Sequence, residues 1–297
     1  MHFISTRSTQ NFILLEKQKT KIEYDEMLSS CTICNSGNIK FYLKDYKGIQ
    51  IFICNSCRTQ FMNPQYSDRY LSDFYAQYQI KDFKHHRYGD DKTPRFAKHD
   101  DNLRLIENFV RPGKFLSVGS GNGIDMEVAS GRGWAVEGYE VDEEFTKILS
   151  ESLKLPMHTG NFVTLDLKNK TYDCVYLNHV IEHPKNPGRY LEKITALLKN
   201  GVILYLATPN IHSFSIRLKK LLDFFGLRKK KASYYDTWQH LTYYNPRYFS
   251  RVLEKKFGFE VLHLSNDVKS ITNGKVQNTV LDKWLFKSGF RLVARKG

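Results

Sequence analysis

Two kinds of hydrophobic segment alternate along residues 112–297. Short apolar runs, typical of buried strands, are followed by segments whose apolar residues recur with helical spacing. The predicted strands are 114–118, 135–140, 172–177, 201–209, 259–264 and 290–296, and the predicted helices are 124–133, 142–153, 187–200 and 246–258. Strands that alternate with helices predict a mostly parallel sheet covered on both faces. We therefore expect an α/β, doubly wound fold here.

The first 111 residues have a different pattern. Residues 1–30 are polar and lack periodicity, 31–64 contain two Cys-x-x-Cys pairs between short strand-like runs, and 65–111 are rich in Tyr and helical in character. A Pro-Gly break at 112–113 precedes the alternating part. We expect an N-terminal tail with a small zinc-ribbon-like module at 1–64, a helical Tyr-rich connector or cap at 65–111, and one larger domain at 112–297.

The four cysteines of the first unit have the spacing of metal ligands. Each pair lies on a tight turn, and a hairpin between the turns would bring four thiolates into the tetrahedron that zinc prefers. The ligands would be Cys31, Cys34, Cys54 and Cys57. Disulfides and unliganded core cysteines are the alternatives, and an expected cytoplasmic location disfavours disulfides. Four protein ligands leave no open position, so we expect a structural Zn²⁺.

The segment FLSVGSGNG carries a predicted strand into three glycines at alternate positions, Gly119, Gly121 and Gly123. A dinucleotide fingerprint would place its third glycine where this chain has Ile124, and no Lys-Ser or Lys-Thr follows as in a phosphate-binding loop. Glu140 ends the next predicted strand, about 20 residues beyond the first glycine, where a carboxylate can accept hydrogen bonds from ribose hydroxyls. The pattern indicates a nucleotide-like cofactor.

This pattern resembles the class I methyltransferases that depend on S-adenosyl-L-methionine (SAM). Three further segments, HTGNF, YDCVYLNHVIEHPKNP and LLKNGVILYLATPN, resemble the family in its order along the chain. The resemblance implies a Rossmann-like sheet of seven strands and SAM as cofactor. The residues to which it assigns cofactor contacts are Gly119, Ser120, Gly121, Gly123, Glu140, Asn161 and Asn178. At Asn161 the family usually has an acidic residue, so that assignment is weaker.

The cysteine unit and the Tyr-rich segment YLSDFYAQYQ together resemble bacterial methyltransferases that act on sugars, polysaccharide precursors or secondary metabolites. The resemblance implies a small-molecule or sugar acceptor. We expect methylation at oxygen, and the basic charge near the C-terminus, described below, adds a lipid-linked acceptor to these classes. The resemblance also implies that Tyr75 and Tyr78 help to cover the cofactor, although aromatic residues at helical spacing more often belong to a core.

Methyl transfer to a hydroxyl needs alignment of the reactants and a base. Ligands of open α/β sheets bind beyond the carboxyl ends of the strands, and the base candidates follow two predicted strands there. They are His179, His183 and His240, with Glu182 to orient one of them or to contact the cofactor. A packing or capping role fits each histidine equally well.

The net charge of +14 is concentrated in the last third of the chain, where residues 201–297 hold 18 Lys and Arg against 6 Asp and Glu. We expect residues 211–239 to form a basic lid, and its part 213–231 to contact a phosphate-bearing or lipid-linked acceptor or a membrane surface. A solvated basic face is the alternative. The chain has no apolar run of about 20 residues and no secretory signal pattern. We therefore expect a cytoplasmic protein, peripheral at most to the inner membrane face.

Two other functions fit parts of the sequence. A zinc unit, basic charge and a SAM domain also occur together in RNA methyltransferases, but those that methylate bases often have an Asn/Asp-Pro-Pro-Tyr/Phe sequence where this chain has NHVI. We therefore do not expect nucleic acid as a partner. A SAM-binding scaffold without turnover is the second alternative, and the intact glycines and Glu140 favour cofactor binding.

Overall fold

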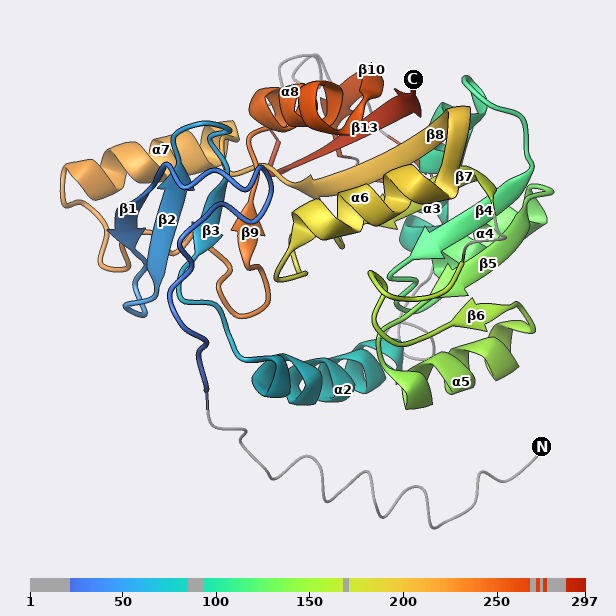
Figure 1. Cartoon of the computed structure of the whole chain (residues 1–297), viewed down its shortest axis with the longest axis horizontal. Coiled ribbons are helices and arrows are strands. Elements are labelled where there is room, and N and C mark those ends of the chain that lie inside the picture. Colours follow the sequence, from blue (N-terminus) through green and yellow to red (C-terminus); the bar gives the residue numbers. More distant parts are fainter. Residues whose placement is uncertain (1–21, 85–92, 168–170, 268–270, 273–274, 277–286) are drawn as a thin grey trace, which may run out of the picture.

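The computed structural model describes residues 22–84, 93–167, 171–267, 271–272, 275–276 and 287–297 of the chain. Its main element is a seven-stranded sheet with the order β10-β13-β8-β7-β4-β5-β6 (Figure 1). The strands are β4 (Lys114–Val118), β5 (Ala135–Tyr139), β6 (Met157–His158), β7 (Tyr172–Asn178), β8 (Leu198–Pro209), β10 (Phe259–Asn266) and β13 (Gly289–Lys296). Only β13 runs against its neighbours, and this mostly parallel sheet confirms the predicted doubly wound, Rossmann-like fold.

Helices cover both faces of the sheet, because alternate residues of each strand point to opposite sides. The helices α6 (Pro187–Leu197) and α8 (Pro246–Phe257) share one core with Leu116 of β4. The helices α3 (Thr93–Glu107) and α4 (Ile124–Gly131) share the other core with its neighbour Phe115. A further helix, α5 (Glu143–Leu153), packs on β6 through Leu149 and Met157.

Local sequence signals explain where these helices begin and end. Asn186 and Asn245 accept hydrogen bonds from the first backbone N–H groups of α6 and α8, and a proline follows each of them in the first turn. Gly258 ends α8 in a left-handed conformation with φ of 69°. The helix α6 ends at Leu197 rather than at residue 200, because Leu198 already pairs with Tyr172 of β7.

A second sheet contains the cysteine pairs. It has four antiparallel strands in the order β1-β2-β3-β9, namely β1 (Ile39–Lys44), β2 (Gln50–Cys54), β3 (Gln60–Met62) and β9 (Thr242–Tyr243). The last of these strands comes from the far end of the chain. Ile51 of β2 also shares a small core with Ile211 and Tyr235. The N-terminal unit and the predicted lid region are therefore packed together, side by side in Figure 1.

The remaining elements lie around these two sheets. The segment 65–111 contains α2 (Asp68–Lys84) as well as α3, and the lid region contains α7 (Phe214–Phe224). Two short strands, β11 (Ile271–Thr272) and β12 (Lys275–Val276), pair with each other. Within the described residues, no helix is both long and apolar enough to cross a membrane.

Candidate active site

The glycine turn joins β4 to α4 at the carboxyl edge of the large sheet. Gly119 and Gly121 have φ angles of 70° and 52°, in the left-handed region that side chains other than glycine rarely adopt. A Cβ atom on Gly119 would lie 2.6 Å from a methyl group of Val180, whereas no described atom lies within 4 Å of the corresponding position at Gly121. The turn therefore presents open backbone at Gly121, as a cofactor site requires.

Glu140 lies beside this turn, just beyond the end of β5. Its side chain is 5% exposed, and Oε1 accepts a hydrogen bond of 2.6 Å from the backbone N–H of Gly121. A carboxylate has about four acceptor positions, so such a bond does not prevent it from accepting hydroxyl groups of a ribose. The structure thus brings together the glycines and the acidic residue that the sequence singled out.

The other predicted cofactor residues lie around the turn in different settings. Ser120 is buried, and its hydroxyl donates to the carbonyl of Ser117. Asn178 ends β7, next to β4, and its Oδ1 atom is buried without a hydrogen-bond partner among the described residues. Asn161 is exposed and accepts a hydrogen bond from Val163 N–H in a turn after β6. Asn178 therefore has an unused acceptor at this edge, whereas Asn161 is engaged in its own turn.

A cluster of titratable side chains follows β7. Glu182 is 1% exposed, and its Oε2 accepts a hydrogen bond of 2.9 Å from the hydroxyl of Thr208 at the end of β8. The carbonyl of Glu182 accepts hydrogen bonds from the N–H groups of Leu241 and Thr242, which directly follow His240 in the sequence. These bonds explain how a histidine almost 60 residues away reaches the end of β7.

The rings of His183 and His240 meet beside Glu182, with their centroids 5.0 Å apart. His240 Nε2 lies 4.0 Å from Glu182 Oε1. Burial lowers the pKa of His240 to about 4, and the carboxylate of Glu182 only partly opposes this effect. Burial raises the pKa of Glu182, but the imidazoles of His179, His183 and His240 more than offset it and bring it to about 2. Near neutral pH the cluster therefore combines an ionised carboxylate with a neutral imidazole.

Tyr75 of α2 also reaches this cluster. Its hydroxyl lies 3.1 Å from His183 Nδ1, and the same nitrogen lies 3.0 Å from the carbonyl oxygen of Gln239. Tyr75 thus lies against the candidate histidine, and its role in covering the cofactor stays a prediction. The side chain of Tyr78 lies outside the described residues.

His179 connects Glu182 to a second buried ion-pair network, formed by Asp267 and Lys98. Its Nε2 lies 2.9 Å from Asp267 Oδ2, which also accepts a hydrogen bond of 2.9 Å from Lys98 of α3. Its Nδ1 lies 3.4 Å from Glu182 Oε1. Burial alone would lower the pKa of His179, but Asp267 and Glu182 raise it above its ordinary value. Among the three histidines, His179 is therefore the one held toward its charged form, which does not suit a base.

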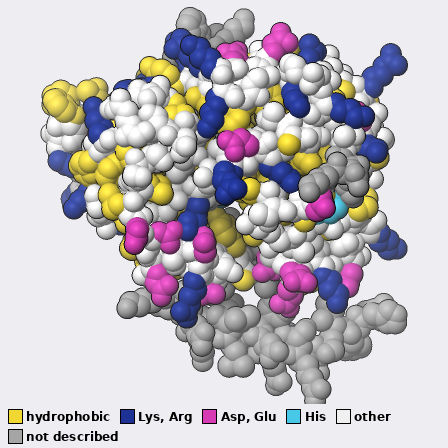
Figure 2. Space-filling view, in the orientation of Figure 1, with side chains coloured by type: hydrophobic (Ala, Val, Ile, Leu, Met, Phe, Trp, Pro, Cys, Tyr) yellow, Lys and Arg dark blue, Asp and Glu magenta, His cyan; other side chains and the backbone are white. Residues whose placement is uncertain are grey.

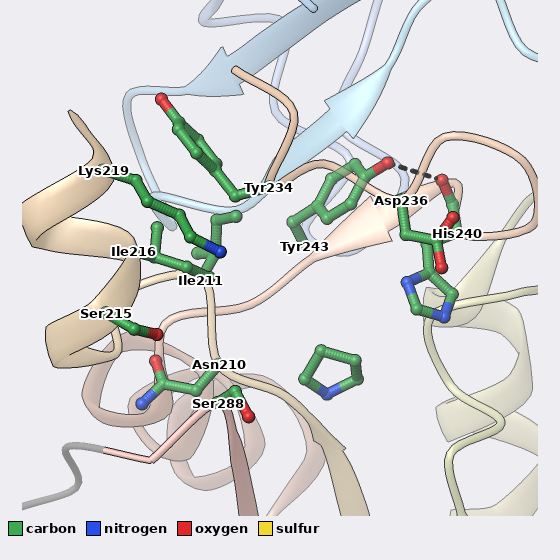
Figure 3. A pocket seen from close by; sticks show the side chains of 11 residues that line it. Asn210, Ile211, Ser215, Ile216, Lys219, Tyr234, Asp236, His240, Tyr243 and Ser288 are labelled. Atoms are coloured by element: carbon green, nitrogen blue, oxygen red, sulfur yellow. Dashed lines mark hydrogen bonds between the residues drawn. The ribbon is translucent and has the colours of Figure 1, made fainter. Parts of the chain in front are cut away.

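A pocket of about 220 Å³ opens beside His240. Figure 3 shows His240 and Asp236 on one side of it and Lys219 and Ser215 of α7 on the other. Asn210 and Ser288 add polar groups to the wall, and the remaining lining residues are Pro209, Ile211, Ile216, Tyr234 and Tyr243. The pocket thus has an apolar wall, one lysine, and the candidate histidine at its edge.

Comparisons with known proteins give the family. The family described as a methyltransferase domain matches residues 84–264, which is more than half of the chain. The chain belongs to the class I SAM-dependent methyltransferases. The match covers the glycine turn, Glu140 and the cluster after β7, so the resemblance seen in the sequence is confirmed at the level of the family.

Individual relatives are distant. The methyltransferase is 26% identical to the ubiquinone biosynthesis O-methyltransferase of Parvibaculum lavamentivorans over 112 residues, which are 35% of this chain and 44% of that protein. The chain therefore spans less than half the length of this curated relative.

Two solved structures share the fold. The magnesium protoporphyrin IX methyltransferase of Synechocystis PCC 6803, solved with bound SAH, has a TM-score of 0.54 at 14% identity, covering 78% of this chain and 100% of that one. A SAM-dependent methyltransferase of Thermotoga maritima, described as a possible histamine N-methyltransferase, has a TM-score of 0.50 at 15% identity, covering 77% and 99%. The acceptors in the names of these two proteins differ, so the shared fold does not indicate an acceptor for this chain.

Sequence reasoning missed three residues of the methyltransferase's site. Lys98 and Asp267 bind His179, and Thr208 binds Glu182. Lys98 lies 81 residues before His179 in the sequence and Asp267 lies 88 after it, and no spacing pattern links such positions. Thr208 lies at the carboxyl end of the predicted strand 201–209. Ligands are expected at that end of the strands, so Thr208 could have been predicted as a site residue from its position.

Glu140→Ala is expected to weaken SAM binding by about 1.5–3 kcal/mol, the usual contribution of a hydrogen bond to a charged group. Isothermal titration calorimetry with SAM measures the change. Glu137→Gln is the control, because Glu137 is a carboxylate on β5, three residues before Glu140, that contacts His158 and Tyr172 instead of the glycine turn. Equal SAM affinity of Glu140→Ala and the wild type would remove Glu140 from the cofactor site.

Proposed function

We propose that this methyltransferase moves the methyl group of SAM to an oxygen atom of a small-molecule, sugar or lipid-linked acceptor. The observation that carries the proposal is the cluster of Glu182, His183 and His240, in which Glu182 is buried and His240 lines a pocket. A Cβ atom on Gly119 would clash with Val180, which lies two residues before Glu182. The glycine turn therefore lies against the segment that leads from β7 to the cluster.

The reaction follows from this arrangement. The acceptor oxygen attacks the methyl carbon of SAM, the bond between that carbon and sulfur breaks, and its electron pair stays on sulfur. The proton of the hydroxyl must leave, and the cluster of an ionised Glu182 and a neutral His240 favours its departure. The carbonyl of Gln239 and the hydroxyl of Tyr75 both contact Nδ1 of His183 and so orient its ring. The chain thus supplies alignment and proton removal, which are what transfer from a good leaving group requires.

SAM itself fits the open backbone of the turn. The proposed contacts are the N–H groups around Gly121, the carboxylate of Glu140 for the ribose, and the unpartnered Oδ1 of Asn178 for the ammonium group. Ser120, Gly119 and Gly123 shape the turn, and Asn161 is the proposed contact near adenine.

The four cysteines suit a structural zinc ion. Cys31 and Cys57 have sulfur atoms 3.5 Å apart, and Cys34 and Cys54 have theirs 3.6 Å apart. All four sulfurs lie within 4.8 Å of one another, and all are free thiols rather than disulfides. A zinc ion with bonds of about 2.3 Å places its four sulfurs about 3.8 Å apart, close to the distances seen. The ion would have no open position, so its role is to stabilise this unit.

Exposed apolar side chains on α7 and directly after it support a lipid-linked acceptor or contact with a membrane surface. Six large side chains are exposed there, including Phe224 at 83% and Leu227 at 71%, and the others are Phe214, Leu218, Leu221 and Phe225. Figure 2 shows hydrophobic side chains with Lys and Arg among them at the end of the molecule where α7 and the small sheet lie. Lys219 of the same helix lines the pocket, where it could meet a phosphate group.

Replacing Lys229, Lys230 and Lys231 with Gln is expected to lower the affinity for vesicles of anionic phospholipid, with a loss of about 1 kcal/mol per residue at low salt. The wild type should show a similar loss as salt rises. Vesicle sedimentation measures both effects. Arg228 is left intact, because it donates to Asp223 and Ser233 and so supports the loop itself. If the triple variant binds vesicles as well as the wild type does at low salt, this run is an ordinary solvated face.

The test of the function is methyl transfer from radiolabelled SAM to a panel of acceptors, comprising free sugars, phenols, polyprenyl-linked sugars and RNA. The curated relative is named an O-methyltransferase, which supports oxygen as the atom methylated. We expect label in a hydroxylated small or lipid-linked acceptor, at oxygen by mass spectrometry of the product. Transfer to RNA alone, or SAM binding without transfer to any acceptor, would contradict the proposal.

A further inference from the structure

We propose that Glu182, His183 and His240 hold a divalent cation beside the acceptor pocket, at a site distinct from the cysteine cluster. The proposed role of this ion in methyl transfer rests on the proposed function, but its binding does not. The three residues each offer one ligand atom, and these atoms lie within 4.8 Å of one another. Two imidazoles and one carboxylate form a ligand set that suits Mn²⁺, Fe²⁺ or Zn²⁺ and leaves coordination positions open.

The strongest support is a buried carboxylate oxygen that accepts no hydrogen bond from the described residues. Glu182 is 1% exposed, and while its Oε2 accepts from Thr208, its Oε1 accepts no hydrogen bond from any described residue. His179 Nδ1 is 3.4 Å away but too poorly aligned for one. Buried carboxylate oxygens are normally satisfied, because leaving one unpaired costs free energy. A cation in front of Oε1 would supply the missing interaction.

The contacts of His183 favour the tautomer that a metal ligand needs. Its Nδ1 lies 3.0 Å from the carbonyl oxygen of Gln239 and 3.1 Å from the hydroxyl of Tyr75. A carbonyl can only accept, so its hydrogen bond forms when Nδ1 carries the proton and Nε2 retains its lone pair, and the Tyr75 oxygen is then a second acceptor for the same N–H. An N–H bonded to a backbone carbonyl is the usual outer contact of a metal-bound histidine. His183 is thus held in the tautomer that can bind an ion.

His240 is the third residue of the proposed ligand set. Its Nε2 faces Glu182 Oε1 at 4.0 Å, and its backbone is held by N–H donation to the carbonyl of Asp236 and by Tyr243, whose hydroxyl donates to the carbonyl of His240. The dashed line in Figure 3 marks the bond from Tyr243. Because His240 also lines the pocket, an ion bound here would border the acceptor. A hydroxyl that coordinates to it would have a lowered pKa and would lose its proton to water more easily.

The test is a titration of the full-length protein with Mn²⁺. The protein is first loaded with one equivalent of Zn²⁺ per chain, which the four thiolates are expected to take, so that no zinc remains for the second site. Electron paramagnetic resonance of free Mn²⁺ gives the amount bound. Mn²⁺ is chosen because it prefers imidazole and carboxylate ligands to thiolates, so the cysteine cluster should not compete for it. We expect one Mn²⁺ per chain, with affinity lowered at least about 10-fold in Glu182→Gln and in His240→Ala.

His158→Ala is the matched control, because His158 is also a part-buried imidazole beside a carboxylate, that of Glu137, but lies on β6 away from the pocket. It should bind Mn²⁺ like the wild type. Retained SAM affinity in Glu182→Gln shows that this variant is folded. No Mn²⁺ binding by the wild type, or equal binding by Glu182→Gln, overturns the metal site even if methyl transfer occurs. Mn²⁺ binding without methyl transfer to any acceptor contradicts the proposed function instead and leaves the metal site standing.

Discussion

His240→Ala is expected to lower the rate of methyl transfer by about 10²–10⁴-fold, the usual range for a group that handles the proton. SAM affinity should change little, because the glycine turn and Glu140 make no described contact with His240. Single-turnover kinetics and calorimetry on the same preparations separate the two quantities. His183→Ala should behave in the same way, since the two rings meet beside one carboxylate.

The matched control is His212→Ala. Burial also lowers the pKa of His212 to about 4. This residue is part-buried like His240 but does not line the pocket. A rate loss in His212→Ala equal to that in His240→Ala would show that any part-buried histidine of this segment matters and that the cluster has no special role. Unchanged turnover in both His183→Ala and His240→Ala would move the acceptor atom from oxygen to nitrogen or carbon.

Cys54→Ser is expected to abolish binding of the proposed zinc ion and to unfold the small sheet. Apparent zinc-binding free energies in small zinc units are about 10–16 kcal/mol, and much of the folding free energy of such units comes from the metal. Ile33 and Phe61 of this unit pack into the core of the large sheet, and Ile51 packs with Ile211 and Tyr235. The described residues therefore form no separate core that could hold the cysteine turns together, and we expect the sheet to unfold when a zinc ligand is lost. Metal analysis of the purified protein, together with limited proteolysis of residues 31–64, measures both effects.

SAM binding should persist in Cys54→Ser, because its proposed contacts lie on the large sheet. Methyl transfer should nevertheless fall, since β3 pairs with β9, and Thr242 of β9 bonds the carbonyl of Glu182. Cys174→Ala is the control, because Cys174 is a buried thiol on β7 outside the cluster. A wild type that contains no zinc under reducing conditions, or a Cys54→Ser variant that retains it, would contradict the zinc assignment.

The parts of the site that lie close together in sequence were predictable from it. The glycine turn and Glu140 belong to one strand–helix–strand unit, whose geometry fixes their separation. Glu182 and His183 follow β7 directly. In the fold, the two-residue strand β6 escaped prediction because it is too short to show a hydrophobic period, and α7 escaped because its apolar side chains face outward rather than into a core.

The partners of His179 and the strand pairing of β9 could not be predicted, and the reason is the same for both. Asp267 and Lys98 reach His179 only because β10, β13 and α3 pack around the sheet. Thr242 and Tyr243 form the edge strand of the N-terminal sheet because the lid region packs against that sheet in the folded protein. Such contacts depend on tertiary packing, and a single sequence carries no local signal for them.

The placement of β9 affects how this protein can be divided or recombined. A shortened protein that begins at residue 112 would leave β9 without its partner strand, and Tyr235 and Ile211 would lose the cover of Ile51. Unpaired strand edges next to exposed apolar side chains promote aggregation. An exchange of the cysteine unit between related enzymes would therefore have to include residues 211–243 as well, so the two segments are expected to be inherited together.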